Sequence, residues 1–188
     1  MYVRLPPRQL IAASLVVLLS AGAQAAGNHS GGHGHHGHAV KIGQPGKASD
    51  VSRTIDVVMT DNQYMPRRIT VAKGRTIRFV IRNKGEIVHE FNIGTSAMHA
   101  GHQKEMAAMF ERGILEIDRI NHDMMNMGGG HGMKHDDPNS VLLEPGKSGE
   151  ILWKFDTDAK LEFACNVPGH YEAGMKGKLI IGRRHAHN

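Results

Sequence analysis

The chain has 188 residues, a formal net charge of +5, 14 histidines, 11 methionines and one cysteine. A single cysteine excludes an internal disulfide. The basic residues are scattered among acidic ones, and no run of Lys and Arg with interleaved aromatic residues indicates a nucleic-acid partner.

The N-terminus has the three parts of an export signal. Arg4 and Arg8 give a basic end, residues 10–19 form an apolar run, and small residues follow, with Ala23 and Ala25 suited to cleavage after Ala25. The apolar run is too short for a transmembrane helix, and no second segment approaches the required length. We therefore predict a signal peptide over residues 1–25, a periplasmic mature protein and no membrane insertion after cleavage.

Residues 26–50 are predicted to form a flexible tail. Its stretch "NHSGGHGHHGHA" is almost entirely Gly and His and cannot build a core, while its imidazoles can bind metal loosely. The folded domain is expected over residues 51–183, which are enough for one hydrophobic core, and residues 184–188 form a polar C-terminal tail.

Short runs rich in Val, Ile, Thr and Phe follow one another through the predicted domain. They are "RTIDVVMT", "RITVA", "TIRFVIRN", "IVHEFNIG", "SVLLEPG", "GEILWKFD", "KLEFAC" and "MKGKLIIG". Turn signals such as "AKG" and "NKG" separate the early runs. In "TIRFVIRN", Ile77, Phe79 and Ile81 occupy alternate positions, as expected of a strand with one buried face. Seven or eight such strands predict an all-β fold, an antiparallel β-sandwich with Greek-key connections.

Residues 95–138 form an insert that breaks this rhythm. Met106, Met109 and Phe110 recur at helical spacing, and the segment ends in the Gly, Met and His stretch "NHDMMNMGGGHGMKHDDP". Because a structureless loop of this length is uncommon inside a domain, we predict a partly helical packed element or a functional segment.

The stretch "CNVPGHYEAGM" lies between two strand patterns near the C-terminus. Its spacing, Cys165-x4-His170-x4-Met175, lets one loop bring a thiolate, an imidazole and a thioether together. His89 in "VHEF" can supply a second imidazole, because a sandwich places distant strands side by side. Outside the two tails and the insert, His89 and His170 are the only histidines in the sequence.

Two imidazole nitrogens and one thiolate in a plane, with a long axial methionine sulfur, form a type 1 copper site. A rigid site of this kind changes little when copper gains or loses an electron, which favours fast electron transfer. Ligation would also protect a lone thiol in an oxidising compartment. We therefore predict His89, Cys165, His170 and Met175 as the ligands of one copper centre, with Met175 tuning its potential.

Three alternatives compete with this prediction. A free cysteine often packs in a core as a small hydrophobic residue. Structural zinc sites close with four Cys or His ligands and seldom use a thioether. A Cys–His hydrolase has no use for the methionine. The four residues together favour copper over each alternative.

The chain resembles the cupredoxins, the plastocyanin and azurin group, in "PRRITVAKGRTIRFVIRNKGEIVHEFNIG" and "FACNVPGHYEAGMKGKLII". Within that group it is most similar to periplasmic copper-tolerance cupredoxins of the CopI type, which pair a His-rich N-terminus with a His/Met-rich insert. The likeness covers residues 53–182 and implies a Greek-key sandwich with the same four copper ligands. The insert is longer than in plain electron carriers, which leaves open whether electron shuttling is the whole function.

The histidines and methionines of the insert predict a second, weaker copper site. Thioethers suit Cu(I), and imidazoles suit either oxidation state. Helical spacing places several of these residues on one face, although a methionine stripe is also typical of core packing. The candidate ligands are Met98, His99, His102, Met106, His131 and Met133.

The predicted function is single-electron transfer in copper tolerance, with copper ions and an unidentified redox or copper-transfer protein as partners. One alternative is a copper buffer or chaperone module. The other is an enzyme that oxidises Cu(I) at the insert and passes the electron to the type 1 centre. A self-contained multicopper oxidase is disfavoured, because it needs several His-x-His pairs, whereas Cys165 is flanked by Ala164 and Asn166.

Overall fold

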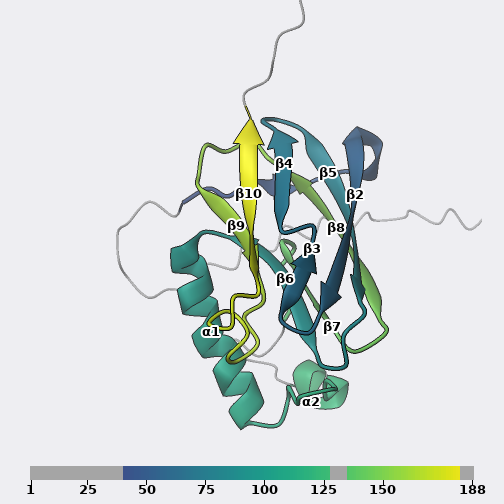
Figure 1. Ribbon diagram of the computed structural model, residues 1–188, viewed down its shortest axis with the longest axis vertical. Coiled ribbons are helices and arrows are strands. Elements are labelled where there is room, and N and C mark those ends of the chain that lie inside the picture. The colour runs from purple at the N-terminus through teal and green to yellow at the C-terminus, as the bar shows by residue number, and fades with distance from the viewer. Residues whose placement is uncertain (1–39, 128–134, 183–188) are drawn as a thin grey trace, which may run out of the picture. The chain divides into compact units, whose positions relative to one another are not determined.

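Two five-stranded β-sheets carry the fold, and one long helix lies beside the second sheet (Figure 1). The computed structural model describes residues 40–127 and 135–182. The strand order is β1-β8-β5-β2-β3 in the first sheet and β4-β10-β9-β6-β7 in the second. The predicted all-β sandwich with a partly helical insert is confirmed.

The first sheet contains β1 (Gln44–Pro45), β2 (Val51–Thr60), β3 (Gln63–Met65), β5 (Thr76–Asn83) and β8 (Ser148–Lys154). The second contains β4 (Arg68–Ala72), β6 (His89–Gly94), β7 (Ser140–Leu143), β9 (Leu161–Ala164) and β10 (Lys176–Gly182). The helices are the 3-10 helix η1 (Ala48–Asp50), α1 (Ser96–Glu111) and α2 (His122–Met127). The described residues thus hold ten strands rather than the seven or eight predicted. Strands as short as β1 and β3 show too little alternation to be recognised.

The strand pairing is mixed, so the prediction of a purely antiparallel sandwich was wrong for two pairs. β2 pairs parallel with β5, and β10 pairs parallel with β4. Between β2 and β5 the chain crosses to the other sheet to form β4, and it returns in the same direction as β2. A crossover of this kind permits parallel neighbours, whereas a hairpin would not.

The core lies between the sheets and follows the alternation expected for β5. Ile77, Phe79 and Ile81 are 2%, 0% and 0% exposed. The ring centroids of Phe79 on β5 and Phe91 on β6 are 5.5 Å apart, so these two side chains pack the two sheets together across the core. Burial of these side chains is the main driving force for the sandwich.

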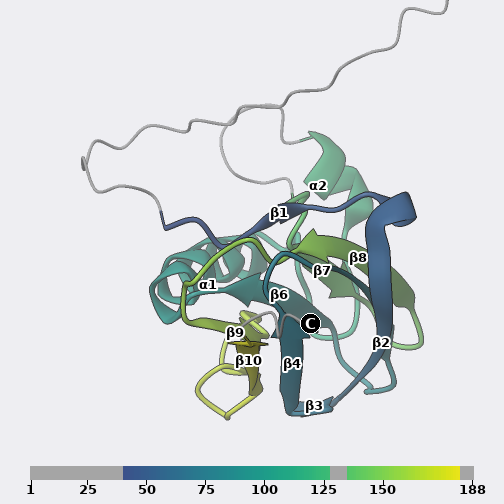
Figure 2. The same cartoon turned by 90° about the horizontal axis from the view of Figure 1, so that it is seen from above.

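Strand β6 is buried on both faces, which decides where the functional groups lie. All six of its residues are buried. Successive side chains of a strand point to opposite faces. Phe91 and Ile93 belong to the hydrophobic core, so Glu90 and Asn92 face the other side. Helix α1 contacts β6 and β9, and it lies beside both strands in Figures 1 and 2.

Helix α1 is built into the domain rather than attached to it. The hydroxyl of Thr95 accepts a hydrogen bond from the amide of Met98 and caps the helix N-terminus. Met106 and Met109 are 0% and 2% exposed and belong to the core. The methionine stripe therefore serves packing at these two positions.

The ordered domain begins earlier than residue 51, the predicted boundary of the flexible tail. Gln44 and Pro45 pair with Lys154 and Trp153 of β8. The indole of Trp153 also donates a hydrogen bond to the carbonyl of Ile42. The predicted signal peptide and the Gly/His stretch lie outside the described residues. No helix within residues 40–127 and 135–182 is long and apolar enough to cross a membrane.

Candidate metal centre

Three metal-ligating side chains from distant parts of the chain converge at one end of the sandwich. His89 is the first residue of β6, Cys165 directly follows β9, and His170 lies in the turn between β9 and β10. Each offers one ligand atom, and these atoms all lie within 4.8 Å of one another. We call these three residues the Cys165 cluster. The sulfur of Cys165 is 3.3 Å from Nδ1 of His170, and the two imidazole rings are 5.0 Å apart between centroids.

The His89 ring is oriented by a carboxylate. Its Nε2 lies 3.0 Å from Oδ1 of Asp61, while its buried Nδ1 has no hydrogen-bond partner among the described residues. A proton on Nε2 that bonds to Asp61 leaves the lone pair on Nδ1. A buried ring nitrogen without a partner is costly unless it has a ligand. This orphaned atom fits a metal bound by His89, Cys165 and His170.

Asp61 is itself held in place, although no sequence pattern singled it out. Its carboxylate accepts a hydrogen bond from the amide of Glu86 at 3.0 Å. A Cβ added at Gly85 would collide with Oδ1 of Asp61 and approach Nε2 of His89, so a residue without a side chain is needed there. The hydrogen bond from His89 lowers the pKa of Asp61. Asp61 is therefore a charged anchor for the ring.

Both imidazoles are kept neutral by their surroundings. Burial lowers the pKa of His89 despite the opposing effect of Asp61. Burial, and then the charge of His89, lower the pKa of His170 to about 4. At neutral pH both rings therefore present lone pairs rather than positive charge, which is the form that a metal requires.

The thiol of Cys165 is fully buried and receives one hydrogen bond. The amide of Glu90 donates to its sulfur at 3.3 Å. Burial raises the pKa of Cys165 far above its ordinary value. In the metal-free protein the group is therefore a thiol, and the positive charge of a metal would be needed to displace its proton.

Met175 closes the loop that carries Cys165 and His170. Its carbonyl accepts a hydrogen bond from the amide of Cys165, and its amide donates to the carbonyl of His170. Gly169 and Gly174 adopt positive φ values of 85° and 92°, which the tight path of the loop requires. The Met175 side chain is fully buried directly before β10. This placement is compatible with its predicted role as axial ligand.

The residues predicted for a second copper site separate in the structure. Met106 lies in the core, His99 is buried against Asn166, and Met98 is 40% exposed. His102 instead meets Glu90 and His135, and these three could hold a metal ion. Sequence reasoning did not single out Glu90. His131 and Met133 lie outside the described residues.

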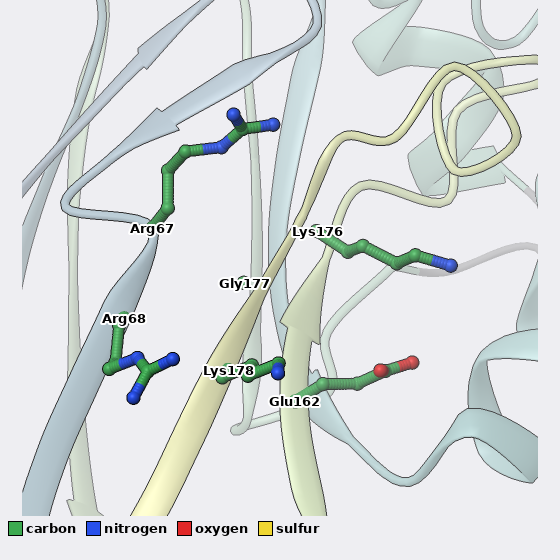
Figure 3. A pocket seen from close by; sticks show the side chains of 6 residues that line it. All are labelled: Arg67, Arg68, Glu162, Lys176, Gly177 and Lys178. Carbon is green, nitrogen blue, oxygen red and sulfur yellow. The ribbon is translucent and has the colours of Figure 1, made fainter.

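A groove on the second sheet is lined mainly by cationic side chains, unlike the two clusters of ligating residues. It has a volume of about 350 Å³ and is lined by Arg67, Arg68, Glu162, Lys176, Gly177 and Lys178. Figure 3 shows its four cationic side chains and its one carboxylate, that of Glu162. Lys and Arg side chains offer no lone pairs and their charges repel a cation, so this groove is not a candidate metal site.

A family model described as a cupredoxin-like domain matches residues 11–114 of the chain. The match includes His89 and ends before Cys165.

Two proteins with the description "copper-resistant cuproprotein CopI" are similar along nearly their whole length. The one from Pseudomonas aeruginosa is 48% identical over 186 residues, which cover 93% of this chain and 98% of that protein. The one from Rubrivivax gelatinosus is 39% identical over 173 residues, which cover 89% of this chain and 92% of that protein.

Solved structures of auracyanins share the fold. Auracyanin B has a TM-score of 0.53 and 18% identity, and the match covers 74% of this chain and 96% of that one. The dithionite-reduced auracyanin of Roseiflexus castenholzii has a TM-score of 0.50 and 23% identity, and the match covers 70% of this chain and 98% of that one.

Proposed function

The chain belongs to the cupredoxin family, and within it to the copper-resistant cuproproteins of the CopI type, and from this premise we propose that its Cys165 cluster binds copper and transfers single electrons. A copper-related function follows from the membership itself. We propose further that the protein acts in the periplasm in copper tolerance, after removal of a signal peptide. Met175 serves as the axial ligand in this proposal.

The observation that carries the proposal is the orphaned Nδ1 of His89 beside the sulfur of Cys165 and Nδ1 of His170. One soft thiolate and two imidazoles form the donor set of a blue-copper electron-transfer site. The alternative of a structural buried thiol explains Cys165 alone. It does not explain why two neutral imidazoles face that thiol.

Copper bound at this cluster would supply a one-electron couple between Cu(I) and Cu(II). The residues of the chain hold the donors in place for both oxidation states. Asp61 fixes the ring of His89, and the amide of Glu90 stabilises negative charge on the sulfur of Cys165. Fixed ligands and hydrogen bonds of this kind tune a metal site.

His170 is the most accessible member of the cluster. His89 and Cys165 are fully buried, whereas His170 is partly exposed in the turn before β10. An electron from a redox partner protein therefore has its shortest path through the His170 ring. The buried sides of the cluster exclude water and protect the thiolate.

Extra copper binding by the His- and Met-rich segments completes the proposed function. The chain carries 14 histidines and 11 methionines, far more than the four proposed ligands need. These segments would raise the local copper supply in a copper-tolerance system.

The proposal is tested by reductive titration of copper-loaded protein and by complementation of a copper-sensitive bacterial strain. We expect one electron per chain to bleach the visible band, and wild-type protein to restore growth on copper. The variant His89→Gln should lose both properties, while His122→Gln, at an exposed histidine of the insert, should keep both. If His89→Gln titrates and complements like wild type, electron transfer at this cluster is not the function.

A further inference from the structure

A second set of ligating atoms surrounds the side chain of Glu90. Glu90 lies on β6 directly after His89, His102 lies on α1, and His135 lies shortly before β7. We call these three residues the Glu90 cluster. Oε1 of Glu90 is 2.9 Å from Nε2 of His102 and 2.7 Å from Nε2 of His135, and the two nitrogens are 3.3 Å apart.

Hydrogen bonds alone do not satisfy this arrangement well. Oε1 of Glu90 also lies 2.6 Å from the hydroxyl of Ser140 and 3.2 Å from the side-chain nitrogen Nδ2 of Asn92. Four donors would then compete for one carboxylate oxygen, whereas both oxygens of a carboxylate together offer about four lone-pair sites. The side chain of Glu90 is fully buried, so water cannot relieve the crowding.

The ring of His102 is held between two carboxylates. Its Nδ1 lies 2.8 Å from the carboxylate of Glu105. Burial lowers the pKa of His102, but the hydrogen bonds with Glu90 and Glu105 outweigh it and raise the pKa to about 9, so in the metal-free protein the ring donates to both carboxylates. A metal ion would take the place of the proton on Nε2. A histidine that donates one ring N–H to a carboxylate while its other nitrogen faces outward is typical of a metal ligand.

The three atoms are spaced for a metal ion. The circle through Oε1 of Glu90 and the two Nε2 atoms has a radius of about 1.7 Å, and bonds of ~2.0 Å place an ion just outside its plane. Two imidazoles and a carboxylate suit Cu(II) or another borderline divalent ion. Cu(I) would prefer thioethers, and the buried Met106 belongs to the core.

An acidic cavity reaches the cluster on the side of His102. A hollow of about 280 Å³ is lined by Asn92, Met98, Gly101, His102, Glu105, Asp137 and Asn139. The carboxylates of Glu105 and Asp137 attract cations to it by their negative charge. An ion in the cluster could take a water molecule from this side as a further ligand, as in open three-residue sites.

We propose that Glu90, His102 and His135 form a second metal site that holds Cu(II) rather than Cu(I). This inference rests on the extra copper binding of the proposed function and gives it defined ligands. It does not depend on the Cys165 cluster, because the two sites share no ligand. The competing explanation is a buried polar network that binds no metal.

The test uses the full chain, loaded with Cu(II) until the visible band of the Cys165 cluster saturates. Further Cu(II) is added, weakly bound ions are removed by dialysis against glycine, and copper per chain is counted with electron paramagnetic resonance. His102→Gln and His135→Gln should each retain one Cu(II) fewer than wild type and the control His122→Gln. Equal counts in all four proteins would overturn the proposal.

The visible band also reports whether each variant folds. If both variants lose the band, Glu105→Gln decides, because Glu105 is 63% exposed and lies outside the core. We expect its second Cu(II) to bind about 10-fold or more weakly, as is typical when the partner of a ligating histidine is lost. Unchanged affinity would overturn the proposal. If instead no protein shows the band but the count still differs, only the proposed function fails.

Discussion

The amide of Glu90 donates a hydrogen bond to the sulfur of Cys165, and the two atoms are 3.3 Å apart. The side chain of Glu90 lies on the face of β6 opposite to the core residues Phe91 and Ile93, where it meets His102 and His135. Its second oxygen accepts hydrogen bonds from the backbone and side-chain nitrogens of Asn166, the residue after Cys165. Glu90 therefore touches both candidate metal sites.

Occupation of the Glu90 cluster is expected to change the proposed copper centre at the Cys165 cluster. A positive ion on the Glu90 carboxylate would alter the hydrogen bonds to Asn166 and the amide that bonds to Cys165. Colourless Zn²⁺ added to copper-loaded protein should shift the visible band, and His102→Gln should remove the shift. A band that Zn²⁺ leaves unchanged in wild type would contradict this coupling.

Asp61→Ala should weaken copper binding without destroying the fold. Asp61 is 44% exposed, yet it orients the His89 ring. Loss of such a partner typically costs 10- to 100-fold in metal affinity. Competition with a chelator measures the effect, and Asp61→Asn should recover part of it because an amide oxygen can still accept the N–H of His89. The matched control is Asp56→Ala, since Asp56 is exposed and pairs with Arg82. Equal losses in both alanine variants would mean that Asp61 has no orienting role.

The metal-free protein should lose stability in mild acid. Burial and the charge of His89 lower the pKa of His170 from 6.5 to about 4. Because this pKa is lower in the folded state, the unfolded chain binds more protons between these values. The contribution to the free energy of unfolding is present above pH 6.5 and is lost as the pH falls towards 4.

Urea unfolding in the presence of a chelator at pH 7, 6, 5 and 4.5 measures this dependence. His170→Asn should show a shallower decline than wild type. An equally steep decline in His170→Asn would show that His170 does not contribute to it.

Met106→Ala should destabilise the domain by about 2–5 kcal/mol, the usual cost of removing a buried methionine side chain. Met106 is fully buried, whereas Met98 on the same helix is 40% exposed and serves as the control. Denaturant unfolding of the metal-free variants distinguishes them. A small effect at Met106 would show that α1 is detachable from the core. Deletion of residues 98–135 removes this packing, so point variants are better probes of the insert.

Sequence patterns predicted the part of the site that depends on residue type and spacing. The Cys165, His170 and Met175 spacing placed three groups on one loop, and His89 was the remaining framework histidine. The structure brings His89, Cys165 and His170 together, as that interpretation requires. The sandwich was likewise predicted from strand alternation, which reflects one buried face per strand.

The residues that sequence reasoning missed act through contacts that no pattern reports. Asp61 lies in a turn between β2 and β3 and resembles any other turn carboxylate in the sequence. Glu90 alternates with core residues on β6, a position that is typical of an exposed side chain when only one face of a sheet is covered. It is buried only because α1 covers that face of β6. The methionines at helical spacing could have served copper binding or core packing, and the structure places Met106 in the core.

The visible absorption of the Cu(II)-loaded full chain tests the central claim most directly. If the sulfur of Cys165 ligates copper in the plane of His89 and His170, wild-type protein shows an intense visible thiolate-to-copper band. Cys165→Ser should abolish this band, and His122→Gln should keep it. An intense band that persists in Cys165→Ser would contradict the account.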